Sequence, residues 1–258
     1  MASARSWSGL LWLLPLLLIA ALAWGVWSGR IVIPERWNPW APLRIDAQPN
    51  FLTRFKLARA SEDRAACQAA LAQAEMTLVP LEDRVTGENC GFDNAVRIER
   101  TSIGVGEPFS LSCRAALSLA MWERHVLQQA AQAQLGARVK RIEHFGSYAC
   151  RNLYGEVGRR RSQHATADAL DVAGFVLEDD RRISVVGDWK RGAVPREADA
   201  PAGGVVAQAV VPSTPESRFL HQVHDGACEY FDTVLGPEYN RAHADHFHFD
   251  RGQARVCR

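Results

Sequence analysis

The chain has 258 residues, of which 47% are hydrophobic, and its 30 Lys and Arg residues nearly balance its 29 Asp and Glu residues. A chain of this length can bury a substantial core in one large domain or two small ones. The near-neutral charge provides no broad positive field, so we expect no nucleic-acid partner. A Gly-x-Ser-x-Gly nucleophile elbow and a glycine-rich phosphate loop are both absent from the sequence, which sets aside serine-hydrolase and nucleotide chemistry.

The N-terminal residues 1–30 contain an apolar segment. Residues 9–27 carry no charge and approach the roughly 20 residues that a membrane-spanning helix needs. We therefore predict a single transmembrane helix that anchors the chain in the inner membrane. Residues 21–23, Ala-Leu-Ala, also fit a signal-peptide cleavage pattern, which leaves a cleaved, soluble form open. Residues 31–58 are rich in Pro and Trp and predict a semi-rigid linker, or alternatively a strap lying on the domain.

The cysteines indicate the compartment of the remaining chain. They are even in number, widely spaced and never arranged as Cys-x-x-Cys; they are Cys67, Cys90, Cys113, Cys150, Cys228 and Cys257. Behind an export-type segment, such a set predicts three disulfides in an oxidising compartment, the alternative being that some are free buried thiols. Of the pairings, we predict only that the cysteine next to the last residue ties down the C-terminus.

Three helices are predicted after the linker. Residues 59–76 are alanine-rich, with Ser61 as N-cap ahead of an acidic first turn. Residues 112–135 form a longer amphipathic pattern that stops at a glycine. A third helix begins at residues 214–216, where a threonine cap is followed by Pro and Glu, and ends at Gly236.

Strands are predicted between and after these helices, at residues 139–148, 169–177, 183–189 and 246–250, with a hairpin turn at 178–181. Residues 191–212 are rich in Gly and Pro and predict a loop over or beside the site. Strands with intervening helices and no regular βαβ alternation predict an α+β domain over residues 59–258, built on a small, mainly antiparallel sheet with flanking helices.

Two clusters carry residues that ligate metals. Residues 162–171 place His164 and Asp171 seven residues apart, where an irregular turn gives way to an apolar run. Farther on, residues 243–250 contain three histidines within six residues, and strand alternation would point His246 and His248 to the same face. Two histidines and a carboxylate suit a catalytic zinc centre, which takes three protein ligands and leaves a fourth position for water.

We expect His164, Asp171 and His248 to hold the zinc, although strand geometry alone would also allow His246 to replace His248. A histidine that remains unligated, His246 or His243, would then act as the base. Asp168 and Asp245 are candidates for fixing an imidazole tautomer. The other histidines lack ligand-type neighbours or lie on helix flanks, and we predict structural positions for His125, His144, His221 and His224.

These motifs resemble those of the zinc peptidases grouped with lysostaphin, the D-Ala-D-Ala metallopeptidases and the hedgehog fold, which share Ser-x-His-x-x-Gly-x-Ala-x-Asp and a later His-x-His. Ser162, His164, Ala169 and Asp171 match the first motif, and Ala167 replaces its usual glycine. A closer resemblance is to the bacterial extensin-like C-terminal family. It covers roughly residues 60–258 and is carried by residues 146–152, 162–165, 169–175, 234–240 and 243–248.

The resemblance implies a hedgehog-type or D-Ala-D-Ala-peptidase-like fold and a periplasmic zinc peptidase that cleaves peptidoglycan stem peptides. It implies the ligands His164, Asp171 and His248, with His246 as base. His243 matches a histidine of penicillin-insensitive murein endopeptidases, and Arg151 stands where relatives place a group facing the substrate carbonyl. Ser162, Asp168 and Asp245 are expected to support the ligands. If residue 167 needs a positive φ, alanine is strained there.

The sequence also allows two alternative functions. One is a non-catalytic wall-binding or assembly module of an envelope-spanning complex, whose zinc would be structural and would usually have four protein ligands. The other is a metal-dependent hydrolase that acts on a different periplasmic ester or amide.

Overall fold

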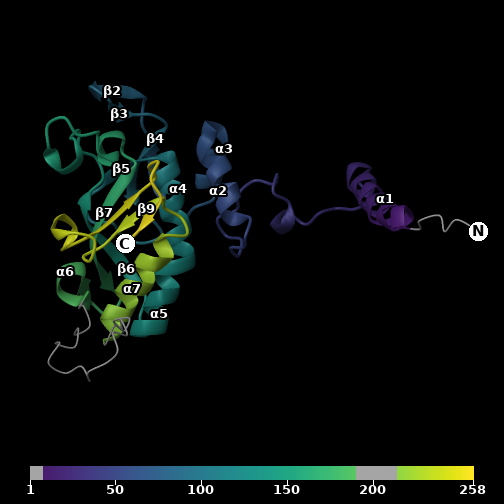
Figure 1. Ribbon diagram of the computed structural model, residues 1–258. Coiled ribbons are helices and arrows are strands. Elements are labelled where there is room, and N and C mark those ends of the chain that lie inside the picture. The colour runs from purple at the N-terminus through teal and green to yellow at the C-terminus, as the bar shows by residue number, and fades with distance from the viewer. Residues whose placement is uncertain (1–7, 190–213) are drawn as a thin grey trace, which may run out of the picture. The chain divides into compact units, whose positions relative to one another are not determined.

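The computed structural model describes residues 8–189 and 214–258 (Figure 1). The loop predicted at residues 191–212 lies outside the described residues. The chain divides into two compact units, residues 1–41 and residues 42–258.

The first unit contains helix α1 (Ser8–Trp27), which has Pro15 inside it, followed by a short 3-10 turn at Glu35–Trp37. The side chains of α1 are described from Trp12 onward, and the large apolar ones among them are exposed. The described part of the chain contains no helix that is both long and apolar enough to cross a membrane, so the transmembrane helix predicted over residues 1–30 is not found there.

The second unit begins with two short helices, α2 (Thr53–Glu62) and α3 (Arg64–Leu71), where one helix was predicted. The break lies at Asp63, which has extended backbone angles and whose carboxylate accepts a hydrogen bond from the Ala66 N–H at 2.6 Å. Ser61, the predicted cap, instead donates to the Leu57 carbonyl inside α2. The helix predicted over residues 59–76 is therefore confirmed only in part, because the helical region begins at Thr53, is interrupted at Asp63 and ends at Leu71, and the position of the N-cap was wrong.

The long helix predicted at 112–135 is confirmed as α4 (Cys113–Trp122) and α5 (Gln128–Leu135), joined without a break by a π-helical turn at Glu123–Leu127. The Ser112 hydroxyl caps its start by accepting from the Ala115 N–H. Gly136 ends it in the left-handed conformation, with φ of 67°, which glycine adopts without a steric penalty.

The main sheet has the strand order β11-β9-β10-β7-β6, and β8 also pairs with β7. Its strands are β6 (Val139–Gly146), β7 (Ala169–Leu177), β8 (Arg182–Ser184), β9 (Thr233–Leu235), β10 (Phe247–Asp250) and β11 (Val256–Cys257). All pairs are antiparallel except β11 with β9. Because β6 runs along one edge of β7, strands β10 and β8 share its other edge, at residues 169–172 and 174–176. The structure is therefore a mixed α+β fold with mostly antiparallel sheets.

Two smaller sheets lie between α3 and α4 in the chain. One has the order β1-β4-β5 and the other pairs β2 with β3. These strands are β1 (Thr77–Pro80), β2 (Arg84–Gly87), β3 (Cys90–Phe92), β4 (Ala95–Arg100) and β5 (Phe109–Ser112). None of the five was predicted, because they are short and most of them lack a clear alternation of buried and exposed residues.

The strand predicted at 183–189 was wrong from Val185 onward, because helix α6 (Val185–Asp188) follows β8 and is capped by Ser184. The hairpin that joins β7 to β8 at residues 178–181 is confirmed. Helix α7 (Pro215–Ala227) begins at the predicted Thr214 cap. It ends well before the predicted Gly236, since β9 follows it.

Helices α4, α5 and α7 lie beside the main sheet (Figure 1). The ring of Trp122 on α4 contacts Phe249 on β10 at 5.3 Å between centroids, and its indole N–H donates to the Val223 carbonyl of α7. Phe219 on α7 packs edge-on against Phe175 on β7 at 5.2 Å. All four aromatic side chains are fully buried, so this face of the sheet forms the core and its opposite face is available for a site.

All six cysteines are paired, as Cys67–Cys113, Cys90–Cys150 and Cys228–Cys257. The prediction of three disulfides is confirmed, as is the prediction that the final cysteine secures the C-terminus. Disulfides persist in oxidising compartments, so the three bonds indicate an extracytoplasmic location.

Candidate metal centre

The pairing of β10 with β7 brings two candidate ligands together. His248 lies directly opposite Asp171 in the antiparallel register. Phe247 and Phe249 alternate with His248 and are fully buried in the core, so the histidine points to the other face. Directly opposite side chains start about 4.5–5.5 Å apart at Cβ, which places the imidazole against the carboxylate.

His164 reaches the same point from a 3-10 turn at Gln163–Thr166, just before β7. The Ser162 hydroxyl opens this turn by accepting from the His164 N–H, and Ala167 closes it in the left-handed conformation with φ of 55°. The strain expected of alanine at this position is therefore present. Its methyl group is fully buried against Phe92 and Ala95, a contact that glycine would not make.

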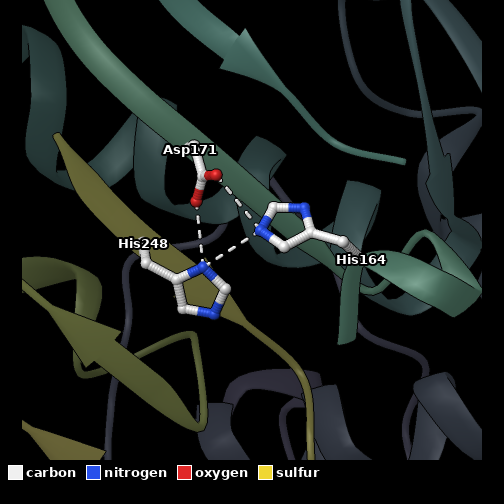
Figure 2. A group of neighbouring side chains, drawn as sticks. All are labelled: His164, Asp171 and His248. Atoms are coloured by element: carbon white, nitrogen blue, oxygen red, sulfur yellow. Dashed lines mark hydrogen bonds and ion pairs between the residues drawn. The ribbon is translucent and has the colours of Figure 1, made fainter. Parts of the chain in front are cut away.

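The three side chains converge on one another (Figure 2). The His248 Nδ1 lies 2.9 Å from an Asp171 oxygen and 3.2 Å from the His164 Nε2, which in turn lies 3.2 Å from the other Asp171 oxygen. The potential ligand atoms of these three described residues all lie within 4.8 Å of one another. We call His164, Asp171 and His248 the donor group. His164 and His248 are almost completely buried.

The outer nitrogen of each imidazole has an acceptor. The His164 Nδ1 donates to the Ser147 carbonyl at 3.1 Å, and the His248 Nε2 donates to the Asp250 carboxylate at 2.9 Å. These bonds put the proton on the outer nitrogen, so the nitrogen that faces the centre of the group can carry a lone pair. Such an acceptor behind a ligating histidine fixes its tautomer and raises its basicity.

The charges in the group are strongly coupled. Burial disfavours ionisation of Asp171, but hydrogen bonds from His164 and His248 and their positive charges hold its pKa far below the usual range. Burial likewise disfavours the imidazolium of His248, but hydrogen bonds to Asp171 and Asp250 raise its pKa to about 9. The carboxylates therefore favour a cation at this position, either a proton or a metal ion.

His246 and His243 lie beside the group rather than within it. The His246 Nε2 is 3.5 Å from an Asp171 oxygen, and its Nδ1 donates to Asp245 at 2.8 Å. The His243 Nδ1 donates to the Asn240 side-chain oxygen at 2.8 Å. Burial and the positive charges of His248 and His246 lower the pKa of His243 to about 4, so His243 is neutral at neutral pH.

A cleft of about 560 Å³ opens in front of these residues. It is lined by the three convergent side chains, by His243 and His246, and by exposed Arg151. The positive charge of Arg151 contributes to the lowered pKa of His243.

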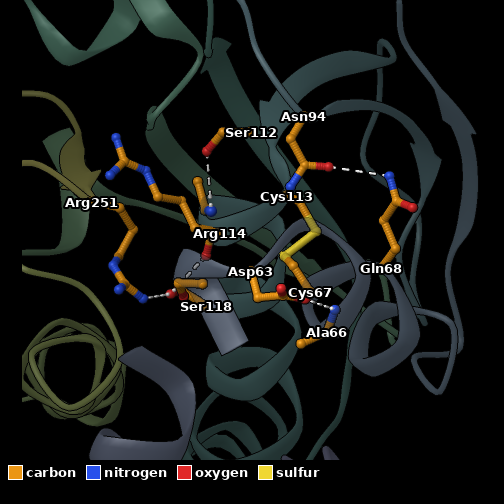
Figure 3. The surroundings of a disulfide bond; sticks show 12 residues. Asp63, Ala66, Cys67, Gln68, Asn94, Ser112, Cys113, Arg114, Ser118 and Arg251 are labelled. Carbon is orange, nitrogen blue, oxygen red and sulfur yellow. Dashed lines mark hydrogen bonds between the residues drawn. A yellow bond between two sulfur atoms is a disulfide. The ribbon is translucent and has the colours of Figure 1, made fainter. Parts of the chain in front are cut away.

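Asp168 makes its hydrogen bonds away from the imidazoles. Its carboxylate accepts from Arg114 at 2.7 and 2.5 Å and also from Ser112 and Thr166. Ser112 and Arg114 lie at the start of α4 beside the Cys67–Cys113 disulfide, which joins α3 to α4 (Figure 3). Asp168 therefore connects the turn that carries His164 to the start of α4, which the disulfide joins to α3. Its side chain makes no hydrogen bond to the described side chains of the donor group.

The remaining predicted structural histidines make other contacts. His125 bonds to the Ile45 carbonyl and His144 to the Glu107 carbonyl. On α7, His221 stacks on Trp189 at 3.8 Å, and His224 bonds to Asp225 and to the Arg258 carbonyl. His125 and His224 are both buried, although a helix flank was predicted for His224.

Three residues that hold the histidines of the site by hydrogen bonds were not predicted. Ser147 acts through its backbone oxygen, which carries no side-chain signal. Asn240 orients His243 from a loop whose conformation is not apparent in the sequence. Asp250 had a usable signal, because it is two residues from His248 on the same strand and must share its face.

The fold and the site together define an extracytoplasmic α+β protein with a buried His-Asp-His group that is compatible with a metal site. A profile described as extensin-like protein C-terminus matches residues 65–258. The chain therefore belongs to the extensin-like C-terminal family. Neither the curated proteins nor the solved structures contain a significant match to it.

Proposed function

We propose that this protein is a zinc-dependent peptidoglycan peptidase of the periplasm, and that it cleaves stem-peptide cross-links as an endopeptidase. The observation that carries the proposal is the convergence of one carboxylate and two imidazoles, each with its outer nitrogen satisfied, at the floor of a cleft. The resemblance to lysostaphin-type, D-Ala-D-Ala-peptidase and hedgehog-type domains supports the same reaction class.

The donor atoms fit zinc. Bonds of about 2.0–2.1 Å in a tetrahedral centre place neighbouring ligand atoms roughly 3.3 Å apart. The observed separations of 2.9–3.2 Å among His164, Asp171 and His248 are close to this value. When bound, Zn²⁺ supplies Lewis acidity, which polarises a carbonyl and makes water nucleophilic near neutral pH.

His246 is the proposed base. Its Nδ1–H is committed to Asp245, so the neutral imidazole has its lone pair on Nε2, beside Asp171. This nitrogen takes a proton from the attacking water and returns it to the leaving amine. The neighbouring carboxylates Asp245 and Asp171 stabilise the imidazolium that forms between these two transfers.

His243 and Arg151 have different proposed roles. Because the pKa of His243 is lowered to about 4, this residue stays neutral and accepts a hydrogen bond from a substrate N–H rather than carrying the proton. Arg151 lines the cleft with a permanent positive charge, which stabilises the negative oxygen that develops on the scissile carbonyl.

The test uses oxidised, zinc-loaded protein incubated with intact peptidoglycan, with and without a chelator, and mass spectrometry of the muropeptides. We expect loss of cross-linked dimers that stops with chelator and returns with zinc. His164→Ala should abolish the reaction, and His144→Ala, which lies outside the donor group, should retain it. Unchanged muropeptides from folded, zinc-containing wild-type protein would refute the peptidase.

The competing function is a wall-binding or assembly module with a structural zinc. The observation in its favour is the closeness of His246 to Asp171, since a small movement would add a fourth protein ligand. X-ray absorption of the zinc-loaded protein distinguishes the two, because a structural site has four protein ligands and a catalytic site has three.

A further inference from the structure

One wall of the cleft is a hairpin formed by residues 151–162. Asn152 pairs with Arg161 in an antiparallel bridge. On either side of this pair, the Leu153 N–H donates to the Arg160 carbonyl and the Ser162 N–H donates to the Arg151 carbonyl, at 3.0 and 3.1 Å. Pairing therefore extends over three residues of each arm and sets the register of the hairpin.

This register sorts the side chains between two faces. Successive residues of a strand point to opposite sides, so Arg151, Leu153, Arg160 and Ser162 share one face. All four line the cleft. Arg161 points to the opposite face, where it donates to the Asn152 side chain and to the Glu88 carbonyl at 2.8 and 2.9 Å. The alternation of the hairpin thus places two arginines in the lining of the cleft that also contains His164, Asp171 and His248.

The guanidinium N–H groups of both cleft-facing arginines have no hydrogen-bond partner among the described residues. Among the described residues, neither Arg151 nor Arg160 makes an ion pair or a side-chain hydrogen bond, whereas Arg159 pairs with Glu156 at 2.8 Å. The carboxylates within the cleft, Asp171 and Asp250, already accept from imidazoles. The cleft therefore offers two guanidinium groups that pair with no carboxylate of the described residues.

The hairpin is fixed on both sides. Cys150, immediately before Arg151, is bonded to Cys90 on β3. At the tip, the Tyr154 hydroxyl accepts from the Asn240 side chain at 3.0 Å, and the same Asn240 holds His243. Tyr154 has a positive φ of 57°, a conformation that a bulky residue adopts only where the surroundings impose it. The backbone that carries the two arginines is therefore held in place next to the cleft.

We propose that Arg160 binds a free carboxylate of the substrate next to the scissile amide, so that the protein selects peptides that carry this negative charge, while Arg151 keeps its proposed role at the scissile carbonyl. The inference rests on the proposed function and adds the chemistry of substrate recognition to it. Arg151 and Arg160 are diagonal neighbours in the antiparallel pair and therefore lie about 7–8 Å apart, so a carboxylate bound at Arg160 lies close to a scissile carbonyl bound at Arg151. The planar guanidinium forms paired hydrogen bonds with a carboxylate. Stem peptides retain such free carboxylates on their acidic residues and at their C-terminus.

The experiment is a calorimetric titration of the full-length, zinc-loaded protein with a stem tetrapeptide of L-Ala, γ-D-Glu, meso-diaminopimelate and D-Ala, and with the same peptide converted to carboxamides. Wild-type protein should bind the free-carboxylate peptide more tightly. Arg160→Gln should weaken that binding about 10- to 100-fold, the usual contribution of a charged hydrogen bond, and leave binding of the amide unchanged. Arg160→Lys should retain part of the preference.

Arg159→Gln is the matched control, because this neighbouring arginine faces Glu156 outside the cleft and should bind both peptides like wild type. If wild-type protein binds neither peptide or binds both equally, or if Arg160→Gln behaves like Arg159→Gln, the proposal is overturned. Peptidoglycan cleavage is scored separately. Carboxylate-selective binding without cleavage would uphold this inference and refute the peptidase, whereas cleavage without selectivity would do the reverse.

Discussion

Replacement of Asp250 by Asn tests whether the hydrogen bond behind His248 contributes to zinc binding by the donor group. The two oxygens of Asp250 serve different donors, since one accepts from the His248 Nε2–H at 2.9 Å and the other from the Gly252 N–H at 2.8 Å. Asparagine has the same shape but only one oxygen. Its NH₂ group must therefore face either an imidazole N–H or a backbone N–H, and one buried donor loses its partner.

The expected loss follows from this geometry. A buried donor left without its partner costs about 1–3 kcal/mol, and the loss of an acceptor behind a ligating histidine typically weakens metal binding by about 10- to 100-fold. If the introduced amide turns its oxygen toward Gly252, the imidazole loses the bond that keeps its proton on Nε2. We therefore expect zinc affinity to fall by about 10- to 100-fold, with the ligand set itself intact.

The assay is competition for zinc with a chromophoric chelator at fixed pH, accompanied by thermal unfolding of the metal-free protein. Asp225→Asn is the control, because Asp225 bonds to His224, a histidine outside the donor group. This control should bind zinc like wild type. An Asp250→Asn protein whose zinc affinity lies within about twofold of wild type would contradict the reasoning, because such a change is far smaller than the loss of a supporting acceptor produces.

Three further predictions concern pH, covalent structure and packing. Since the pKa of His248 is raised to about 9, zinc must displace a proton from this imidazole in order to bind near neutral pH. The apparent affinity for zinc should therefore rise about tenfold per pH unit from pH 7 toward 9 and then level off, which zinc titrations in matched buffers will measure. The same shift stabilises the metal-free protein below about pH 6.5, and this stabilisation should be lost as the pH rises through 9, which denaturant melts at several pH values will show. Replacing Cys90 and Cys150 by Ser opens a loop of 60 residues and should lower the free energy of unfolding by up to about 4 kcal/mol, as measured by urea titration; an unchanged midpoint would contradict this. Phe249→Ala removes a fully buried ring and should destabilise by about 3–5 kcal/mol, whereas fully exposed Val157→Ala should be neutral in the same melts.

Local signals in the sequence were sufficient for several elements. The bounds of β7, the start of α7 at its threonine cap and the glycine stop of α5 follow from alternation and capping within a few residues. The strands between residues 77 and 112 were missed because each has only three to six residues and is defined by its partner strand. Pairing between distant segments leaves little trace in either segment alone.

The site shows the same division. His164, Asp171 and His248 were accessible to sequence reasoning because metals require particular side chains at short spacing. The partner of Asp168 was not, because Arg114 lies 54 residues away. The position of Arg160 could not be derived either, since it depends on a hairpin register that only the backbone hydrogen bonds reveal.

The register of β10 on β7 has a consequence for how the proposed zinc would be acquired. His248 lies 77 residues beyond Asp171, and the two meet only when β10 has docked. An unfolded or partly translocated chain therefore offers no complete site, and zinc loading must follow folding. Because zinc then binds only the native state, a free concentration about 100 times its Kd would add about 2.7 kcal/mol of stability. The supply of the proposed zinc would thus change the stability of the folded protein, independently of any reaction that it catalyses.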